Sequence, residues 1–356
     1  MANLFSPLHL RGVELKNRIA ISPMCQYSAT DGFANDWHLV HLGSRAVGGA
    51  GLVITEATAV SPEGRISPGD LGIWKDEHIP FLKRITDFIH QNGSVAGIQL
   101  AHAGHKASSH KPWDGGRYAS PEEGGWQPVA ASEHALLADD KKANALTAEG
   151  IHQVIDDFKA AAHRALAAGF RVIEIHAAHG YLLNGFLSPL VNQRTDEYGG
   201  SFENRIRLLR TIVKETRGIL ADDFPLIVRI SASDWVEGGW TINDSVALAK
   251  VLHENGVDLI DCSSGGLAPP SAIKIGPNYQ VPFAETIKNK VGIKTGAVGM
   301  ITEASQADEI IVANKADLVL IARESLRNPM FPLSAAHELG HDVQWPIQYV
   351  RAQKKR

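Results

Sequence analysis

Short apolar runs rich in β-branched residues alternate along the chain with longer stretches whose apolar residues recur about every three to four positions. The short runs have the composition of buried strands, and the longer stretches have the period of amphipathic helices. Eight such pairs follow a short N-terminal segment. The expected strands are residues 18–22, 51–57, 94–100, 171–176, 226–230, 259–262, 294–297 and 318–321, and the expected helices lie near 36–48, 78–92, 147–168, 202–220, 242–255, 282–290, 303–313 and 325–339.

This alternation predicts a parallel sheet closed into a single (β/α)8 TIM barrel, an α/β fold in one domain over residues 1–356. A doubly wound open sheet is the alternative, but no Gly-x-Gly-x-x-Gly follows the first strand, and eight pairs fit closure better. Residues 101–146, after the third strand, are too long for an ordinary connection. We expect them to form an excursion over the barrel mouth, a lid with a small hairpin.

The composition is that of a soluble globular protein without a nucleic-acid surface. Its 356 residues are 44% hydrophobic and 21% charged, with a formal net charge of -4, and the one basic block is Lys354-Lys355-Arg356. No segment offers about twenty uncharged apolar residues, so we expect no membrane span. The N-terminus lacks the apolar core of a secretory signal, and Cys25 and Cys262 have no paired-ligand spacing. A cytoplasmic protein with reduced thiols is expected.

Two imidazoles and a phenol follow the fourth predicted strand in the run His176-Ala-Ala-His179-Gly-Tyr181. Barrel active sites are built at the C-terminal ends of the strands, and all three side chains can donate a hydrogen bond to a developing oxyanion. The same residues could instead hold a metal ion, or could be buried packing residues. The run alone therefore indicates a chemical site without choosing among these possibilities.

Other predicted strands also end in residues that would share this mouth. Cys25 and Tyr27 follow the first strand, Gln99 ends the third, and Arg229 lies at the end of the fifth. Lys106, in the excursion, is expected to be a solvated loop residue unless the excursion folds inward. So many polar side chains at the ends of the predicted strands indicate a binding site at the barrel mouth.

The loops after strands seven and eight commonly form a phosphate site in barrels. Here the run Gly296-Ala-Val-Gly299 lets backbone approach an anion, because glycine has no Cβ, and Arg323 adds a fork of donors. With Gln99 and Arg229 at the same mouth, a phosphorylated heterocycle is the expected occupant.

Four motifs, with the chain's ending, resemble the Old Yellow Enzyme family, and the resemblance covers almost the whole chain. The longest motif is very specific. Cys25, the short length and the ending Pro346-Ile-Gln-Tyr-Val-Arg351 are similar to its thermophilic-like or xenobiotic-reductase branch of NADPH dehydrogenases. The motifs are Ser22-Pro-Met-Cys-Gln-Tyr27, Gln99-Leu-Ala-His-Ala-Gly104, His176-Ala-Ala-His-Gly-Tyr-Leu182 and Ser188-Pro-Leu-Val-Asn-Gln-Arg-Thr-Asp-Glu-Tyr-Gly-Gly200.

The resemblance implies an FMN-dependent ene-reductase, in which NADPH or NADH reduces FMN and an activated alkene then takes hydride from flavin N5. It implies that His176 and His179 bind the substrate carbonyl, that Tyr181 protonates Cα, and that Tyr27 helps to position the substrate. Cys25 would tune the flavin potential and not act as a nucleophile. The implied FMN contacts are Ser22, Pro23, Met24 and Cys25 along the ring, Ala57 at its plane, Gln99 at the pyrimidine edge, Arg229 at N1 and O2, and Gly299, Ala322 and Arg323 at the phosphate.

The same branch implies a homodimer or homotetramer in which Arg351, within the tail 341–356, reaches a neighbouring active site. Two other functions stay open: a metal-dependent hydrolase with His176 and His179 as ligands, and a non-catalytic flavin sensor. A third metal ligand is hard to nominate, and the intact donor trio argues against the sensor. An iron–sulfur dienoyl reductase would need four clustered cysteines, which this chain lacks.

Overall fold

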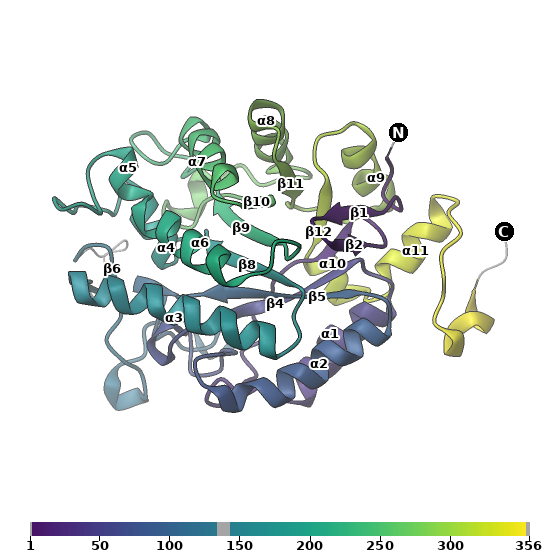
Figure 1. Ribbon diagram of the computed structural model, residues 1–356, viewed down its shortest axis with the longest axis horizontal. Coiled ribbons are helices and arrows are strands. Elements are labelled where there is room, and N and C mark those ends of the chain that lie inside the picture. The colour runs from purple at the N-terminus through teal and green to yellow at the C-terminus, as the bar shows by residue number, and fades with distance from the viewer. Residues whose placement is uncertain (1, 134–142, 354–356) are drawn as a thin grey trace.

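Eight parallel strands close into a barrel, which confirms the fold predicted from the alternating pattern (Figure 1). The computed structural model describes residues 2–133 and 143–353. The barrel strands are β3 (Ile19–Ile21), β4 (Leu52–Ala59), β5 (Val95–Ala101), β8 (Val172–Ala177), β9 (Leu226–Ser231), β10 (Leu259–Ser263), β11 (Lys294–Ala297) and β12 (Leu318–Ile321). Around the barrel they follow the order β10-β11-β12-β3-β4-β5-β8-β9, so β10 closes on β9.

Helices surround the barrel and cover the outer faces of its strands (Figure 1). None of the helices in the described part of the chain is long and apolar enough to cross a membrane. The helices are α1 (Asp36–Val47), α2 (Ile79–Gln91), α3 (Ala148–Ala167), α4 (Leu182–Leu187), α5 (Phe202–Arg205), α6 (Arg207–Ile219), α7 (Ile242–Glu254), α8 (Val281–Val291), α9 (Ala304–Val312), α10 (Arg323–Arg327) and α11 (Phe331–Glu338).

Alternate residues of each strand face two different apolar cores. Ile173 and Ile175 of β8 face outward and belong to the same cluster as Phe158 of α3. Val172 of β8 and Leu259 of β10 belong to the smaller cluster inside the barrel. Because successive side chains of a strand point to opposite faces, Glu174 and His176 share the inward face with Val172.

The N-terminal segment forms an antiparallel hairpin of β1 (Leu8–Leu10) and β2 (Val13–Leu15), which the sequence analysis did not anticipate. Leu8, Leu10 and Leu15 belong to the same apolar cluster as the inward residues of the barrel. The hairpin therefore closes the N-terminal end of the barrel and leaves the other end as the open mouth.

Two of the predicted helices are divided. The helix expected near 202–220 is α5 and α6, separated only at Ile206, whose φ of -81° and ψ of -10° remain close to helical. The helix expected near 325–339 is α10 and α11. Asn328 leaves the helical region there, with φ -131° and ψ 88°, because the following Pro329 disfavours helical backbone in the residue before it.

Residues 102–128 follow β5 with only short 3-10 turns, and a small antiparallel turn lies among them. Ser109 and Tyr118 form an antiparallel bridge, and the backbone N–H of His110 donates to the Arg117 carbonyl at 2.8 Å. Further along, β6 (Val129–Ala130) pairs with β7 (Asn144–Ala145), and this pair is parallel. Residues 134–142 of the excursion lie outside the described residues.

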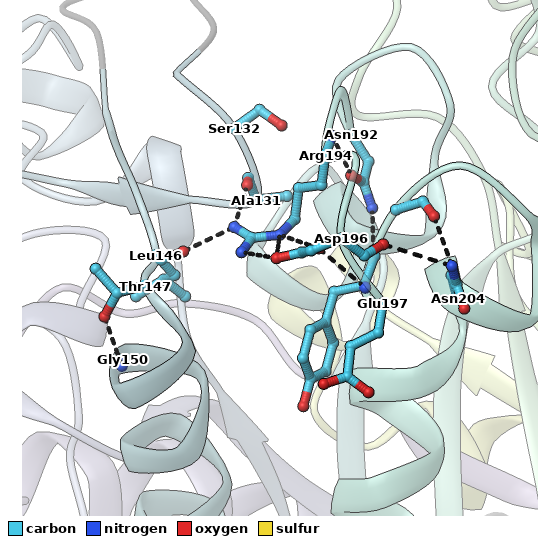
Figure 2. A network of polar contacts seen from close by, with 12 residues as sticks. Ala131, Ser132, Leu146, Thr147, Gly150, Asn192, Arg194, Asp196, Glu197 and Asn204 are labelled. Atoms are coloured by element: carbon cyan, nitrogen blue, oxygen red, sulfur yellow. Dashed lines mark hydrogen bonds and ion pairs between the residues drawn. The ribbon is translucent and has the colours of Figure 1, made fainter.

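The motif at 188–200 links two parts of the excursion, at Ala131 and at Leu146 (Figure 2). Nη1 of Arg194 donates to the carbonyl of Ala131 at 2.8 Å and to that of Leu146 at 2.7 Å. Nε of Arg194 donates to Oδ1 of Asp196 at 3.0 Å, which fixes the plane of the guanidinium. The most specific motif of the sequence is thus a clamp on the excursion.

We expect Arg194→Lys to loosen this clamp, because a lysine is a point donor that cannot reproduce the planar fork. A hydrogen bond from a charged group contributes about 1.5–3 kcal/mol, so the backbone N–H of Leu146, which donates to the Ala130 carbonyl at 2.9 Å, should exchange with solvent about tenfold faster or more. Hydrogen exchange measures this, with Arg84→Lys as the control at an exposed ion pair. Unchanged exchange at Leu146 would contradict the clamp.

Candidate active site

The predicted flavin-contacting residues lie around the C-terminal ends of the barrel strands. The backbone N–H of Ser22 donates to the carbonyl of Ile321 at 3.1 Å. The loop carrying Pro23, Met24 and Cys25 therefore starts beside the end of β12, where Ala322 and Arg323 follow.

The next strands around the barrel continue this ring of residues. Ala57 of β4 is the register partner of Gln99 in β5, next to an irregularity in the β4–β5 pairing. His176 of β8 is the register partner of Arg229 in β9. Residues widely separated in the sequence are therefore neighbours at one mouth, as closure of a parallel barrel requires.

His176, His179 and Tyr181 form one aromatic cluster with His176 in the middle. The ring centroid of His176 lies 5.1 Å from that of His179 and 5.0 Å from that of Tyr181, and both contacts are edge-to-face. His179 has a φ of 61°, a left-handed conformation that is uncommon outside glycine. The structure thus brings together the three donors that the sequence placed after this strand.

The hydrogen bonds of His176 determine which nitrogen carries its proton. The backbone N–H of Ala178 donates to Nδ1 of His176 at 3.2 Å, so Nδ1 is the acceptor and Nε2 carries the proton of the neutral ring. Burial, followed by the charges of Arg229 and Lys106, lowers the pKa of His176 well below its ordinary value. Burial and Arg229 have the same effect on the pKa of His179. Both rings are therefore neutral N–H donors near pH 7.

His179 is held by serines that the sequence analysis did not select. Its backbone N–H donates to Oγ of Ser231 at 2.9 Å, and its Nε2 lies 2.6 Å from Oγ of Ser263. The other contact of the Ser263 hydroxyl, to Oε1 of Gln280, is longer at 3.3 Å, and that oxygen already accepts from Ser264 at 2.7 Å. Because this contact occupies Nε2, Nδ1 is the ring nitrogen of His179 that can face a ligand.

Tyr181 is held in its protonated form. Burial raises the pKa of its phenol above the ordinary value, and Cys25, Tyr27 and Asp70 raise it further. A phenol that stays protonated across the neutral range can act as a general acid.

Cys25 lies near Tyr27 and Tyr181 at the mouth, and its side chain is a neutral thiol. Burial raises the pKa of Cys25 well above its ordinary value, and the carboxyl groups of Asp70 and Glu56 raise it further. Hydrogen bonds link the thiol to the backbone of Ala57 and to the side chain of Tyr27. Since the thiolate is the nucleophilic form of cysteine, this site does not favour nucleophilic chemistry at Cys25.

Two buried carboxyl groups beneath the mouth were missed by the sequence analysis. Oε1 of Glu174 accepts from Nε2 of Gln99 at 2.7 Å, and Oδ2 of Asp261 lies 3.0 Å from Nε of Arg229. The signal was a single charged residue inside each apolar run, in Val172-Ile173-Glu174-Ile175 and in Leu259-Ile260-Asp261-Cys262.

The contacts of Gln99 and Arg229 leave polar atoms of both side chains for a flavin ring. Glu174 contacts only Nε2 of Gln99, and Asp261 contacts only Nε of Arg229. Among the described residues, no hydrogen bond uses the terminal nitrogens of Arg229. An amide and a guanidinium held in this way match the carbonyl and nitrogen acceptors along the pyrimidine edge of a flavin.

The residues expected at the phosphate lie near Tyr279. Gly299 has a φ of 129°, and a Cβ there would lie 3.2 Å from the backbone nitrogen of Gln280 and from the Tyr279 ring. Burial raises the pKa of Tyr279, while Arg323 and Arg229 lower it, so both cations act on the same phenol. This end of the mouth therefore combines close backbone approach with positive charge, which suits a phosphate.

A cavity of about 520 Å³ opens above the aromatic cluster and is bordered by Tyr27 and Tyr181. The excursion lines one side with Pro112 and Tyr118, and the segment after β10 lines the other with Leu267. This cavity is large enough for a small organic substrate.

The excursion folds inward over this cavity. Trp113 packs edge-to-face on Tyr27, with 5.8 Å between the ring centroids. Nζ of Lys106 donates to the carbonyls of His179 and Gly266, at 2.7 and 2.6 Å. The exception stated for Lys106 therefore applies: the excursion folds inward, and the ammonium group has two carbonyl partners instead of being solvated.

The geometry does not favour the metal-dependent hydrolase. Within residues 2–133 and 143–353, no group of three or more His, Cys, Asp or Glu side chains is placed to hold a metal ion. Nδ1 of His176 already accepts from Ala178, and Nε2 of His179 contacts Ser263, so each ring has one nitrogen engaged.

Arg351 does not lie at the mouth of its own barrel. The tail segment from Trp345 to Gln348 borders a cavity together with Asn17 and Gly93, which precede β3 and β5. The tail therefore packs near the N-terminal end of the barrel, and its residues 347–352 lie beside α11 (Figure 1). Residues 354–356, the basic block, lie outside the described residues.

Comparison with known proteins gives the family. The model of the NADH:flavin oxidoreductase / NADH oxidase family matches residues 3–342. An NADPH dehydrogenase of Halalkalibacterium halodurans is 50% identical over 351 residues, which cover 98% of this chain and 98% of that protein.

Solved structures of similar proteins agree. The old yellow enzyme homologue of Zymomonas mobilis has a TM-score of 0.78 at 26% identity, covering 100% of this chain and 97% of that one. Morphinone reductase in complex with tetrahydroNAD has a TM-score of 0.78 at 26% identity, covering 97% of this chain and 93% of that one. The chain belongs to the NADH:flavin oxidoreductase / NADH oxidase family and is an FMN-dependent oxidoreductase of the Old Yellow Enzyme type that uses NAD(P)H.

Proposed function

We propose that this enzyme reduces the C=C bond of α,β-unsaturated carbonyl compounds, and of related activated alkenes such as nitroalkenes. The observation that carries the proposal is the aromatic cluster, in which two neutral imidazole donors lie beside a protonated phenol. Donors to an oxyanion and an acid for carbon are the two functions that this chemistry needs from a protein.

FMN is proposed to lie across the mouth, against the loop after β3. Bound FMN supplies the hydride, after its own reduction by NAD(P)H. Gln99 and Arg229 would hold its pyrimidine edge, where the positive charge of Arg229 favours the anionic reduced form. The other proposed contacts are Ser22, Pro23, Met24, Cys25 and Ala57 at the ring, and Gly299, Ala322 and Arg323 at the phosphate.

His176 and His179 are proposed to bind the substrate carbonyl. Hydride addition at the β-carbon places negative charge on this oxygen, and donation from Nε2 of His176 would stabilise it. Nδ1, the ring nitrogen of His179 that Ser263 does not contact, would provide the second contact to this oxygen. Neither ring needs to change its charge, because both are neutral donors before the substrate binds.

Tyr181 is proposed to give its proton to the α-carbon, and Tyr27 to position the substrate in the same cavity. The raised pKa of Tyr181 keeps that proton in place until carbanion character develops on the substrate. The neighbouring Cys25, a neutral thiol, would tune the flavin potential through its contact with the ring.

An anaerobic experiment with purified protein separates this proposal from the alternatives. The protein should be yellow, should bleach when NADPH or NADH is added, and should recover its colour when cyclohexenone or maleimide follows. Bleaching without recovery would favour a flavin sensor. Colourless protein that retains zinc would favour the metal-dependent hydrolase.

We further propose a homodimer or homotetramer in which Arg351 enters a neighbouring active site. The tail that carries it exposes apolar side chains: Ile347 is 83% exposed, and Tyr349 and Val350 are 43% and 49% exposed. On α1, Trp37 is also 58% exposed, next to the loop of the active site, where its Nε1 donates to Gln26 at 3.1 Å. Burial of these surfaces between subunits would favour association.

Replacing Arg351 with alanine is expected to raise KM for an anionic or carbonyl substrate about tenfold, since a hydrogen bond from a charged group contributes about 1.5–3 kcal/mol. The oligomer should persist in size-exclusion chromatography, because the apolar residues of the tail remain. Arg327→Ala, at an exposed helix ion pair, serves as the control. An intact oligomer with unchanged KM would contradict the intersubunit role.

A further inference from the structure

Four neighbouring strands each direct one polar side chain into the barrel below the mouth. The residues are Gln99 of β5, Glu174 of β8, Arg229 of β9 and Asp261 of β10, and none is more than 5% exposed. Gln99 donates to Glu174 at 2.7 Å, and Arg229 contacts Asp261 at 3.0 Å. Because β8 and β9 are neighbouring strands, the two pairs lie side by side and form a polar row in the barrel interior.

This row has more acceptors than donors. Oε2 of Glu174 and both carboxyl oxygens of Asp261 are buried and lack a well-aligned hydrogen bond within the described part of the chain. Arg229 and Asp261 are close enough for an ion pair, although the angle at Nε is poor for a hydrogen bond. Polar atoms buried without a partner are costly, and an added proton on a carboxyl group would turn an acceptor into a donor.

The charges of the row do not balance if both acids are ionised. Glu174 and Asp261 would then carry two negative charges against the single positive charge of Arg229, away from water. The neighbouring groups do not supply the missing charge: His176, above Glu174 on β8, is held neutral, and Lys106 lies higher, on the carbonyls of His179 and Gly266. A dry interior disfavours such an unpaired charge.

The remaining barrel strands add no cation to the interior. Glu56 of β4 pairs with His38 of α1, with 3.3 Å between Oε1 and Nε2, and Lys294 at the start of β11 is exposed. Strands β3 and β12 contain only apolar residues.

The pKa shifts of Glu174 and Asp261 agree with this excess of negative charge. Burial raises the pKa of Glu174 far above its ordinary value, and the Asp261 charge raises it further, whereas Arg229 and Gln99 lower it. Burial also raises the pKa of Asp261, and Arg229 opposes that effect. Because the charge of Asp261 acts on Glu174, the two acids titrate as a pair.

We propose that Glu174 and Asp261 share one proton behind Arg229, and that this pair binds the proton more tightly when negative charge appears at the flavin edge that Arg229 contacts. The inference rests on the proposed placement of FMN against Gln99 and Arg229. NAD(P)H delivers two electrons and one proton as hydride. In oxidised enzyme whose pair has lost the shared proton, the pair regains that one proton from water on reduction: one of its two carboxylates becomes a carboxylic acid, and no electron moves within the pair.

The pair acts by positioning charge and is not a catalytic residue set. With one shared proton, the row is neutral overall, and the Arg229 charge is balanced by a single carboxylate. Loss of that proton would leave a net negative charge beneath the flavin and would make reduction harder. The proton therefore keeps the mouth suited to an anionic reduced flavin at neutral pH.

The test is the midpoint potential of the holoenzyme as a function of pH, measured by anaerobic spectroscopic titration. For a two-electron couple, each proton taken up lowers the potential by about 30 mV per pH unit, because a tenfold change in an equilibrium corresponds to 29.6 mV. Reduction to the anionic flavin takes up one proton. The slope of the wild-type enzyme near neutral pH should therefore be steeper than that of a single proton. It should approach the slope of two protons where the pair binds its proton on reduction.

Glu174→Gln should return the slope to that of a single proton, because glutamine keeps the acceptor for Gln99 but cannot titrate. Asp261→Asn gives a second variant that tests the same pair. Asp258→Asn, just before β10 and paired with Arg11 at the other end of the barrel, is the matched control and should keep the wild-type slope. A wild-type slope of a single proton across the neutral range would overturn the coupling to the flavin.

Infrared spectroscopy of the unmodified holoenzyme gives a readout that needs no variant or turnover. The reduced-minus-oxidised difference spectrum should contain a carboxylic acid C=O band that shifts in D2O, and Glu174→Gln or Asp261→Asn should remove it. Absence of the band in the wild type would overturn uptake of the shared proton on reduction. Recovery of flavin colour by an alkene reports on the proposed function separately, so either idea can fail while the other stands.

Discussion

Replacing Tyr181 with phenylalanine should slow alkene reduction by roughly 10²- to 10⁴-fold, the usual contribution of a positioned general acid. Reduction of the flavin by NADPH should stay close to the wild-type rate, because that step needs no proton from Tyr181. Stopped-flow measurement of the two half-reactions separates these effects. The ring of phenylalanine keeps the edge-to-face contact with His176, so the cluster should remain packed.

Tyr118→Phe is the matched control for this experiment. Tyr118 borders the same cavity, but its hydroxyl donates to the carbonyl of Trp126 at 3.2 Å and lies outside the aromatic cluster. Its removal should leave both half-reactions nearly unchanged. Equal slowing of both half-reactions in Tyr181→Phe would contradict Tyr181 as a dedicated proton donor.

Replacing His176 with alanine should slow the alkene half-reaction by about 10²- to 10³-fold, as loss of one oxyanion donor does in other enzymes. The same variant should bind phenols more weakly, because a phenolate resembles the enolate that the imidazoles stabilise. Spectral titration of the oxidised enzyme measures this affinity. His179→Ala should act in the same direction.

His176→Asn provides the control, since asparagine keeps an N–H donor in place of Nε2 while it lacks the aromatic ring. It should recover part of the phenol affinity lost in His176→Ala. Phenol affinity that is unchanged in both alanine variants would show that the imidazoles do not bind the carbonyl oxygen.

The barrel could be predicted from the sequence because closure depends on the count and order of strands. Strands such as Leu318–Ile321 are apolar and rich in β-branched residues, and their alternation with amphipathic helices leaves few topologies. The division of the last helix was predictable in principle from Pro329. The path of the excursion was not, because it depends on contacts such as that of Arg194 with two distant carbonyls.

The aromatic cluster of the site could also be predicted from the sequence, whereas the residues that support it could not. His176, His179 and Tyr181 follow directly after a strand, where barrel sites are expected. Glu174 and Asp261 sit inside strands, and a single charged residue there is usually solvent-facing in an open sheet. Only closure of the barrel turns both inward, beneath Gln99 and Arg229.

Ser263 and Lys106 also support the site and could not be selected from the sequence. Each acts on His179 through a contact across the mouth, at 2.6 Å from the ring for Ser263 and at 2.7 Å from the carbonyl for Lys106. Neither belongs to the His-x-x-His-x-Tyr run, and the distance in sequence hides the contact. Such partners become visible only when the strands are arranged around the barrel.

The central claim is that this enzyme reduces the alkene and leaves the carbonyl intact, and isotopic labelling tests it most directly. Cyclohexenone should be reduced anaerobically with NADPH that carries deuterium at the transferable position of its nicotinamide. Our account predicts cyclohexanone with deuterium on the β-carbon and, when the reaction is run in D2O, a second deuterium on the α-carbon. An allylic alcohol with deuterium on the carbonyl carbon would contradict it.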